Sequence, residues 1–403
     1  MANKKGNNKE LYFTVLGPSG AGKTTMLACM YNEFEDLRSG MLVPDAQTSR
    51  IMQIAYSRLK TSANSSSSEF ETAIEGTEDM REYRFDIKGR TETLPIRFYD
   101  FPGGWMDSSK KEYAKVEEIV RKSAAILVAV NTPYVVEEDG LYAEDGINGS
   151  TIQNLIANSY ITEDSKNNTI SRNKLILLVP IKCEKYTKTI EDTRRMCAKL
   201  KEKGIFKRTV GLMNNPVYAD NTAMAILPIH TVGNAEFEKF KKDRDGKIVG
   251  EVYKKVQGKT FSPMDTEQPI RFVMSFLLNE IARIKSDEMN NDKKRFPWMC
   301  AAKVAAGAAI GAAIGSWIPF IGTGIGAGIG GFWGGCVGSE DDGLKALQNT
   351  LQRQEFLELG DFIRQGMKLN DPRFEIIGGR DKLENIPLSK LEALFNADKN
   401  NKK

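Results

Sequence analysis

The sequence predicts an α/β fold with a mostly parallel sheet that helices cover on both faces. Two observations carry this prediction. Along residues 10–290, short and nearly uninterrupted apolar runs alternate with helical stretches, which is typical of parallel strands buried on both faces. In addition, the first apolar run, 11–16, leads through a glycine-rich loop directly into a helical stretch.

The composition allows a sizeable core. The chain has 403 residues, of which 27% are charged, and its formal net charge is +4. This length suits two domains, and the nearly balanced charge does not indicate a nucleic-acid partner. Five cysteines without a C-x-x-C pair argue against a disulfide framework and favour a reducing cytosol. Residues 1–9 are polar, lack a signal region and are predicted to be disordered, so the first domain is expected in the cytoplasm.

The loop after the first strand has the pattern of a phosphate-binding P-loop. Residues 17–24 read GPSGAGKT and match G-x-x-x-x-G-K-[ST] in full. Glycines allow the backbone N–H groups to turn toward phosphate oxygens at the positive end of the following helix. Lys23 is expected to reach the β- and γ-phosphates, and Thr24 to ligate Mg²⁺. The predicted phosphate-binding residues are Gly17, Ser19, Gly20, Ala21, Gly22, Lys23, Thr24 and Thr25.

A second chemical element follows a predicted β-hairpin over 82–100. The hairpin ends at Asp100, and 100–103 reads D-F-P-G, a D-x-x-G pattern. After a complete P-loop, such an aspartate is expected on the Mg²⁺ side of the site, and the N–H of Gly103 is expected to sense the γ-phosphate. Lys23, Asp100 and Gly103 are therefore the candidate catalytic residues, and an ordinary Asp-Pro-Gly turn is the alternative.

The remaining pattern extends the alternation to about residue 285. Helices are predicted near 26–38, 48–60, 110–123, 191–204 and 268–285, and strands over 124–130, 175–181 and 225–229. Residues 61–79 are predicted as a serine-rich mobile loop, and 132–173 as a variable polar region. An exposed hairpin is predicted within 247–256. The 268–285 helix is amphipathic and is expected to close the domain.

This order of parts resembles a GTPase of the translation-factor-like (TRAFAC) P-loop class. The resemblance rests on the P-loop, the D-x-x-G and a candidate base-recognition element after the strand at 175–181. The runs VLGPSGAGKTTMLACMY and QPIRFVMSFLL also resemble the bacterial double-GTPase-type domains of conflict and defence systems. The resemblance implies a nucleoside triphosphate, GTP, as ligand with Mg²⁺, hydrolysis of that nucleotide, and a role in antiviral defence.

The base-recognition element departs from the class pattern [NT]-K-x-D. Here 181–184 reads Ile-Lys-Cys-Glu, so Lys182 matches while Glu184 replaces the aspartate with a side chain one methylene longer. Glu184 can still accept both guanine N–H donors, whereas Ile181 cannot donate the usual side-chain hydrogen bond. Lys182 and Glu184 are the candidate base-binding residues, GTP is favoured and ATP stays open. Residues 230–233 stand where such folds place a base-contacting backbone loop.

The catalytic position also departs from the class. Gly104, followed by Trp105, stands where many of these GTPases carry a water-orienting glutamine. Intrinsic hydrolysis is therefore expected to be slow, or to depend on a residue that a partner protein supplies. The switch threonine that closes over Mg²⁺ is expected at Thr77, with Thr72 as the alternative.

A glycine-rich stretch, 298–338, is predicted as a hydrophobic helical hairpin. Val304 to Gly338 contains no charged residue, and Pro319 divides it into two arms. Glycines at every fourth position, a pattern that allows close helix packing, are Gly307, Gly311 and Gly315 in the first arm and Gly322, Gly326, Gly330 and Gly334 in the second. An uncharged run of this length is typical of a membrane segment. The basic residues 293–295 before it favour a cytoplasmic N-terminal side.

The same stretch has a second interpretation. Because it is rich in Gly and Ala, it is only mildly hydrophobic, and a helical pair that packs within an oligomer would also use this pattern. Residues 339–403 are predicted as a helical tail that serves docking. Two functions follow: a nucleotide-dependent switch that controls a membrane-associated glycine zipper, or a nucleotide-binding scaffold whose hairpin mediates self-association.

Overall fold

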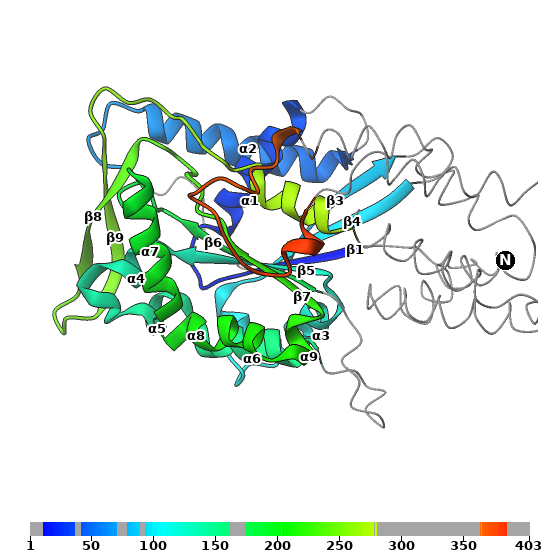
Figure 1. Ribbon diagram of the computed structural model, residues 1–403. Coiled ribbons are helices and arrows are strands. Elements are labelled where there is room, and N and C mark those ends of the chain that lie inside the picture. The colour runs from blue at the N-terminus through cyan, green and yellow to red at the C-terminus, as the bar shows by residue number, and fades with distance from the viewer. Residues whose placement is uncertain are drawn as a thin grey trace, which may run out of the picture.

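A computed structural model describes residues 11–36, 42–70, 79–88, 93–160, 174–202, 204–277, 279, 363 and 365–384. Within this part, strands and helices alternate and form one central sheet with helices on both faces (Figure 1). The predicted fold class, a mostly parallel α/β sheet, is confirmed. The predicted disordered N-terminus and the glycine-rich stretch 298–338 lie outside the described residues.

The central sheet has eight strands in the order β10-β7-β6-β5-β1-β4-β3-β2. From β7 to β4 the neighbours are parallel, whereas β2, β3 and β10 pair antiparallel. The strands are β1 Leu11–Leu16, β2 Leu42–Pro44, β3 Arg81–Lys88, β4 Thr93–Asp100, β5 Ala125–Asn131, β6 Lys174–Ile181, β7 Thr222–Ile226 and β10 Glu375–Gly378. The predicted hairpin is confirmed, because β3 and β4 pair from Arg81 with Asp100 to Lys88 with Thr93.

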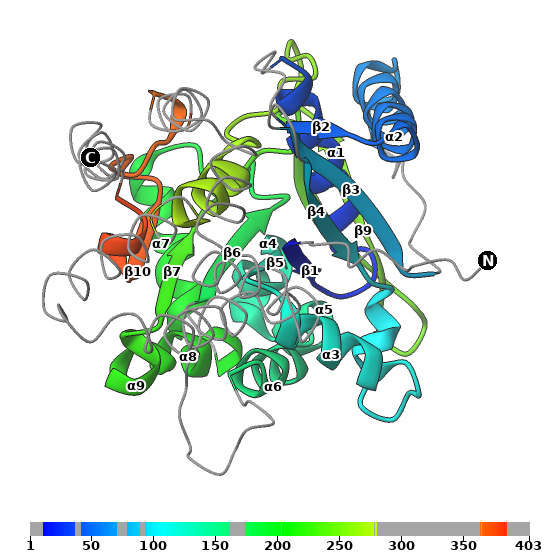
Figure 2. The same cartoon turned by 90° about the vertical axis from the view of Figure 1, so that its right-hand side faces the viewer.

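Two hydrophobic cores lie on the two faces of this sheet. Figure 2 shows the helices that cover both faces. Helices α1, α2 and 268–277 cover one face, and α3, α6, α7 and α8 cover the other. The helices are α1 Lys23–Asp36, α2 Ala46–Asn64, α3 Tyr113–Lys122, α4 Thr132–Val136, α5 Ala143–Ile147, α6 Gly149–Asn158, α7 Ile190–Glu202, α8 Gly204–Gly211 and α9 Pro216–Ala219. Leu127 packs in the first core and its neighbour Val128 in the second, which explains why β5 is apolar at successive positions.

A second, two-stranded sheet lies beside the carboxyl ends of the parallel strands. It consists of β8 Ala235–Lys242 and β9 Ile248–Lys255, which pair antiparallel. The sequence predicts a hairpin only within 247–256, and that prediction is wrong because the whole stretch forms one strand whose partner lies upstream. Strand β8 was not predicted because its many charged residues obscure the alternation of buried and exposed positions. Ala235 and Phe237 are buried, whereas their neighbours are partly exposed.

The predicted loop 61–79 is wrong at 61–64, whereas the described residues 65–70 form a loop with one bridging residue. Helix α2 continues through Asn64, and Glu69 forms a β-bridge with Lys254 of β9. The polar region 132–173 likewise contains three helices, α4 to α6, that the sequence pattern did not indicate. In both places, packing against a hydrophobic core stabilises helical residues in a largely polar stretch of sequence.

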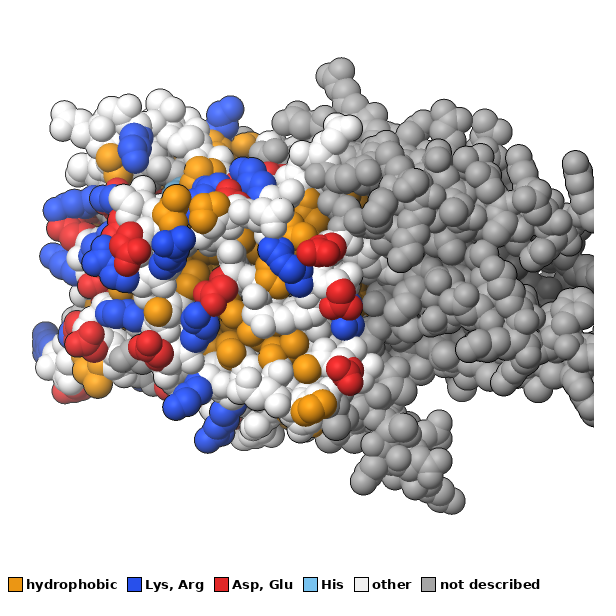
Figure 3. Space-filling view, viewed as in Figure 1, with side chains coloured by type: hydrophobic (Ala, Val, Ile, Leu, Met, Phe, Trp, Pro, Cys, Tyr) orange, Lys and Arg blue, Asp and Glu red, His pale blue; other side chains and the backbone are white. Residues whose placement is uncertain are grey.

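The surface around β8 and β9 carries charges of both signs in close mixture (Figure 3). Lys188 pairs with Glu236 at 2.8 Å, and Lys254 pairs with Glu238. Neighbouring opposite charges therefore compensate one another on this face, in keeping with the small net charge of the sequence.

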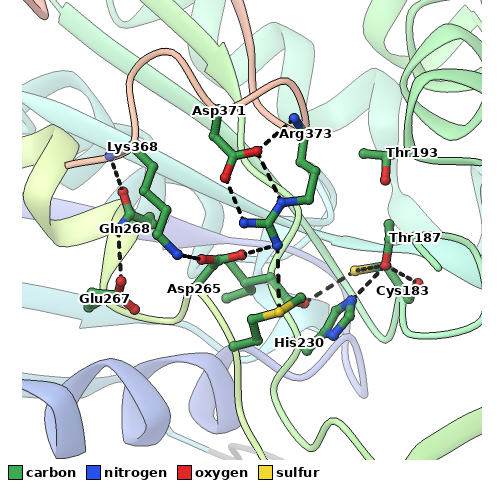
Figure 4. Close-up of polar contacts among 12 residues, drawn as sticks. Cys183, Thr187, Thr193, His230, Asp265, Glu267, Gln268, Lys368, Asp371 and Arg373 are labelled. Atoms are coloured by element: carbon green, nitrogen blue, oxygen red, sulfur yellow. Dashed lines mark hydrogen bonds and ion pairs between the residues drawn. The ribbon is translucent and has the colours of Figure 1, made fainter. Parts of the chain in front are cut away.

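The C-terminal segment packs against the central sheet. Its strand β10 pairs antiparallel with β7 at the edge of the sheet, although the sequence predicts only helices beyond 339. Ile363 and Phe374 join the core beside Phe272. Figure 4 shows a polar contact that fixes the same segment: Asp265 is ion-paired with Lys368 and Arg373.

Candidate functional site

The glycine-rich loop between β1 and α1 has a conformation that only glycine adopts readily. Gly20 and Gly22 have φ angles of 75° and 101°, in the region that L side chains rarely adopt. Gly17 leaves no room for a side chain, because a Cβ there would lie 2.8 Å from the carbonyl oxygen of Ala129. The loop therefore curls tightly at the start of α1, where the backbone N–H groups of a helix are free to bind an anion.

Lys23 lies inside this loop. Its side-chain Nζ donates to the carbonyl oxygens of Gly17 at 2.8 Å and Pro18 at 2.9 Å, and the residue is only 6% exposed. Burial lowers the pKa of Lys23, and the nearby Asp100 carboxylate raises it. An anion bound in the loop would favour the charged ammonium, so Lys23 is placed to hold a negatively charged group.

Thr24 and Asp100 meet beside the loop. The Thr24 hydroxyl donates to Asp100 Oδ2 at 2.9 Å, and both residues are buried. The contact follows from the sheet, since β1 and β4 are adjacent and place Val15 opposite Asp100. Mg²⁺ prefers oxygen ligands such as hydroxyl and carboxylate groups, and it commonly takes one or two protein ligands together with substrate phosphates. This oxygen pair therefore suits a Mg²⁺ ion; the described residues contain no cluster of three or more metal-ligating side chains.

The D-x-x-G turn packs directly against the phosphate loop. Gly103 begins a short 3₁₀ helix, η1 Gly103–Met106, and a Cβ on it would overlap the backbone of Pro18 and Ser19. The turn thus needs glycine because two backbone segments touch there. Gly104 is exposed and has open space around its Cα.

The candidate base-binding residues follow β6. Lys182 has a φ of 56° and donates to the carbonyl oxygen of Gly20 at 2.8 Å, which ties this loop to the phosphate loop. Glu184 is 8% exposed, and its Oε1 accepts the backbone N–H groups of Val232 and Gly233, both at 3.3 Å. The structure therefore brings the element at 181–184 and the loop 230–233, the two predicted base-contacting segments, into direct contact.

One cavity of about 520 Å³ joins these parts. Its lining includes the predicted residues Ser19, Gly20, Gly22, Lys23, Thr24, Thr25, Gly103, Lys182 and Glu184. Gly17, Ala21 and Asp100 lie behind that surface and support it through the backbone or the Thr24 contact. Thr77, its alternative Thr72 and the zipper glycines from Gly307 to Gly334 lie outside the described residues.

Several cavity residues were missed by sequence reasoning. Asn131 ends β5, and β9 contributes residues 248–251 and Tyr253 as a further wall. The end position of Asn131 could have identified it, because ligands bind at the carboxyl ends of parallel strands. Nothing in the sequence of β9 marks it as part of the site, since the hairpin reaches the cavity only through tertiary contacts.

Comparison with known proteins gives only distant similarity. No protein-family model and no curated protein matches the chain. Among solved structures, the chain is similar to the S. cerevisiae Ski7 GTPase-like domain bound to GDP and inorganic phosphate, with 12% identity and a TM-score of 0.33. The same domain bound to GTP gives 14% identity and a TM-score of 0.31. Each match covers 55% of this chain and 43% of the Ski7 chain, so it spans less than half of that protein's chain.

Proposed function

We propose that this protein is a Mg²⁺-dependent nucleotide switch that binds GTP and hydrolyses it slowly. The observation that carries the proposal is the buried Thr24–Asp100 hydrogen bond beside a complete phosphate loop. Thr24 and Asp100 would hold a Mg²⁺ ion, which would supply positive charge to the phosphates of a bound nucleotide. Lys23, buried in the same loop, would compensate the phosphate charge.

The preference for guanine is supported by the hydrogen-bonding groups around Glu184. Its carboxylate accepts N–H donors from Val232 and Gly233. The Watson–Crick edge of guanine has the matching arrangement, with donors at N1 and N2 for the carboxylate and an acceptor at O6 for a backbone N–H. Both hydrogen bonds are long at 3.3 Å, so a base can replace them at small cost. Adenine has an acceptor at N1 and fits this arrangement less well.

Slow hydrolysis is proposed from the residue at position 104. Gly104 is exposed and has no side chain with which to orient water. Gly103 packs on Ser19 of the phosphate loop, and its backbone N–H is the group that would contact the γ-phosphate. Rapid turnover would then require a side chain from a partner protein, as in GTPases that take an arginine in trans.

We also propose that the glycine-rich stretch 298–338 is the output of the switch and associates with membrane. Among the described residues, no helix has the length and hydropathy needed to cross a bilayer, and 298–338 lies outside them. The segments that precede and follow this stretch are both anchored in the same domain. Ser275 donates to the carbonyl oxygen of Leu383 at 2.9 Å, and Asn279 donates to that of Lys382 at 2.8 Å.

These two contacts, together with the burial of Ile363 in the core, support one membrane topology. A chain that leaves a domain after 279 and returns to it by 363 would cross a bilayer an even number of times. With every crossing inside 298–338, the acidic residues 340–342 would lie on the same side as the basic residues 293–295. A hairpin is therefore favoured over a single span. Self-association of the same stretch is the competing outcome.

Calorimetric titration with GTP and with ATP, each with and without Mg²⁺, tests the nucleotide proposal. We expect Mg²⁺-dependent binding that is tighter for GTP and lost in Lys23→Ala. Absence of binding to either nucleotide would overturn it.

Sedimentation with liposomes tests the proposed membrane role of 298–338. Nucleotide-dependent association that is lost on deletion of 298–338 supports this role, whereas nucleotide-dependent oligomers without liposome binding overturn it.

A further inference from the structure

A carboxylate from β9, Glu251, lines the cavity and contacts β5 and the loop after β6. Glu251 accepts hydrogen bonds from Asn131 of β5, from Lys182 after β6 at 2.6 Å and from the Tyr253 hydroxyl at 2.5 Å. Its side chain is only 10% exposed, and Glu251, Asn131, Lys182 and Tyr253 all line the cavity. The buried carboxylate contributes to raising the pKa of Tyr253 well above its usual value, after the larger effect of burial. Tyr253 therefore stays a neutral hydroxyl donor.

The position of Glu251 is defined by Lys182. The Lys182 Nζ donates both to the Gly20 carbonyl in the phosphate loop and to Glu251. Lys182 also belongs to the loop that carries Glu184, the candidate base acceptor. Lys182 thus bridges the phosphate end and the base end of the cavity. In a nucleotide that spans these two ends, the part between them is the sugar.

Asn131 adds an unused acceptor at the same place. It is 3% exposed, and its Nδ2 donates to Glu251. Its Oδ1 is buried and receives no hydrogen bond from the described residues. Leaving a buried acceptor unsatisfied is costly, so such an atom next to a cavity indicates that a ligand donor completes it.

The chemistry of these acceptors suits a sugar with vicinal hydroxyls. A carboxylate has about four acceptor positions, and Asn131, Lys182 and Tyr253 fill three of them. One position on Glu251 and the Asn131 Oδ1 remain for donors. A ribose offers two O–H donors, at the 2′ and 3′ positions, whereas a 2′-deoxyribose offers one.

We propose that Glu251 and Asn131 form a ribose subsite that makes this protein selective for ribonucleotides over deoxyribonucleotides. The proposal rests on the nucleotide function above and extends it to the sugar. The hairpin that carries Glu251 enters the site as a specificity element, and Lys182 couples it to the phosphate loop.

A purely structural role for Glu251 is disfavoured by the other contacts of its hairpin. The rings of Phe237 and Phe240 of β8 pack at a tilt with their centroids 4.9 Å apart, and the Phe240 ring packs on that of Tyr134 with centroids 4.8 Å apart. Phe70 donates its backbone N–H to Tyr253 at 3.0 Å. The hairpin is therefore anchored at several points that do not use the carboxylate.

Calorimetric titration with GTP, 2′-deoxy-GTP and 3′-deoxy-GTP, all with Mg²⁺, tests the subsite. For the unsubstituted protein we expect each deoxy nucleotide to bind about tenfold more weakly than GTP, the loss of one hydrogen bond to a charged or buried acceptor. Glu251→Gln and Asn131→Ala should each weaken GTP while leaving the corresponding deoxy nucleotide nearly unchanged, so that the preference falls to about threefold or less.

Glu238→Gln is the matched control, because Glu238 lies on the same hairpin in a partly exposed ion pair with Lys254 and should keep the full preference. Equal affinity for GTP and both deoxy nucleotides in the unsubstituted protein would overturn the subsite while leaving the nucleotide function intact. Equal weakening of all three nucleotides in both variants would also overturn it, since that is the signature of a structural role. A protein that binds none of them refutes the nucleotide function itself.

Discussion

Asp265 and Arg373 form an ion pair at 2.6 Å that joins the start of the 268–277 helix to the C-terminal segment. The Asp265 side chain is fully buried, and Lys368 pairs with the same carboxylate (Figure 4). Asp371 in turn binds the Arg373 guanidinium at 2.6 Å and orients it. One buried carboxylate therefore holds two cations from a segment that adds β10 to the sheet.

Replacement of this carboxylate should release the C-terminal segment. In Asp265→Asn, the φ of 62° is tolerated because asparagine adopts left-handed backbone readily. The charge is lost while both cations remain, and because their side chains are 42% and 23% exposed we expect a loss of about 2 kcal/mol, below the range for a fully buried pair. Thermal unfolding and amide hydrogen exchange of Glu375–Gly378 measure it, and unchanged exchange at β10 would contradict the prediction.

Gly103 and Gly104 make a matched pair for the contact between the D-x-x-G turn and the phosphate loop. A Cβ at Gly103 would overlap the Ser19 backbone, whereas a Cβ at Gly104 meets nothing within 4 Å. Gly103→Ala should therefore destabilise the fold by about 2 kcal/mol and weaken nucleotide binding, because backbone cannot move aside as a side chain can. Gly104→Ala should change stability by about 0.5 kcal/mol or less. Similar thermal midpoints for the two variants would show that the D-x-x-G turn does not pack tightly against the phosphate loop.

The parallel sheet and phosphate loop could be predicted because their signals are local. A fully buried strand such as β6 must be apolar at every position, and the loop conformation requires glycines at fixed spacing. The edge strand β10 has no such signal, since it is four residues long and its partner β7 lies far away in the sequence. Sequence patterns report local periodicity, and they do not report which distant segment closes a sheet.

The candidate site divides in the same way. Lys23, Thr24 and Asp100 follow from motif spacing, and the structure brings them together. Glu251 could not be found, because a glutamate in a charged strand is ordinarily a solvated residue. Its burial results from packing of the hairpin over the carboxyl ends of the strands.

The stability of the protein should fall in mildly acidic solution because of His230. Burial lowers its pKa below 6.5, outweighing the carboxylates of Glu184 and Asp265, which raise it. The unfolded chain therefore takes up a proton near pH 6.5, before the native chain does. The contribution of this group to stability is fully present above pH 6.5 and is lost as the pH falls from there through the lowered native pKa.

Thermal unfolding between about pH 7.5 and about pH 5.5 measures this effect. His230→Gln is the control, because the chain contains a single histidine and glutamine can still bond to Thr187 at that position. We expect the midpoint of the unsubstituted protein to decrease over this range more steeply than that of the variant. Equal slopes would assign the pH dependence to carboxylates.

Glu184 should determine how the protein distinguishes guanine from related bases. If its carboxylate accepts both N1–H and the 2-amino group, ITP, which lacks that amino group, should bind about tenfold more weakly than GTP. In Glu184→Gln, the amide offers one acceptor oxygen and a donor in place of two acceptors, so GTP should weaken more than ITP and the difference should close. Glu191→Gln, which changes an exposed carboxylate at the start of α7, should leave both affinities unchanged.

The alternative role for Glu184 is to hold the loop 230–233, since its carboxylate accepts hydrogen bonds from the backbone of Val232 and Gly233. Were the carboxylate only a clamp for that loop, the substitution would lower both affinities by the same factor, because the loop would lose its position without any loss of contact to the 2-amino group.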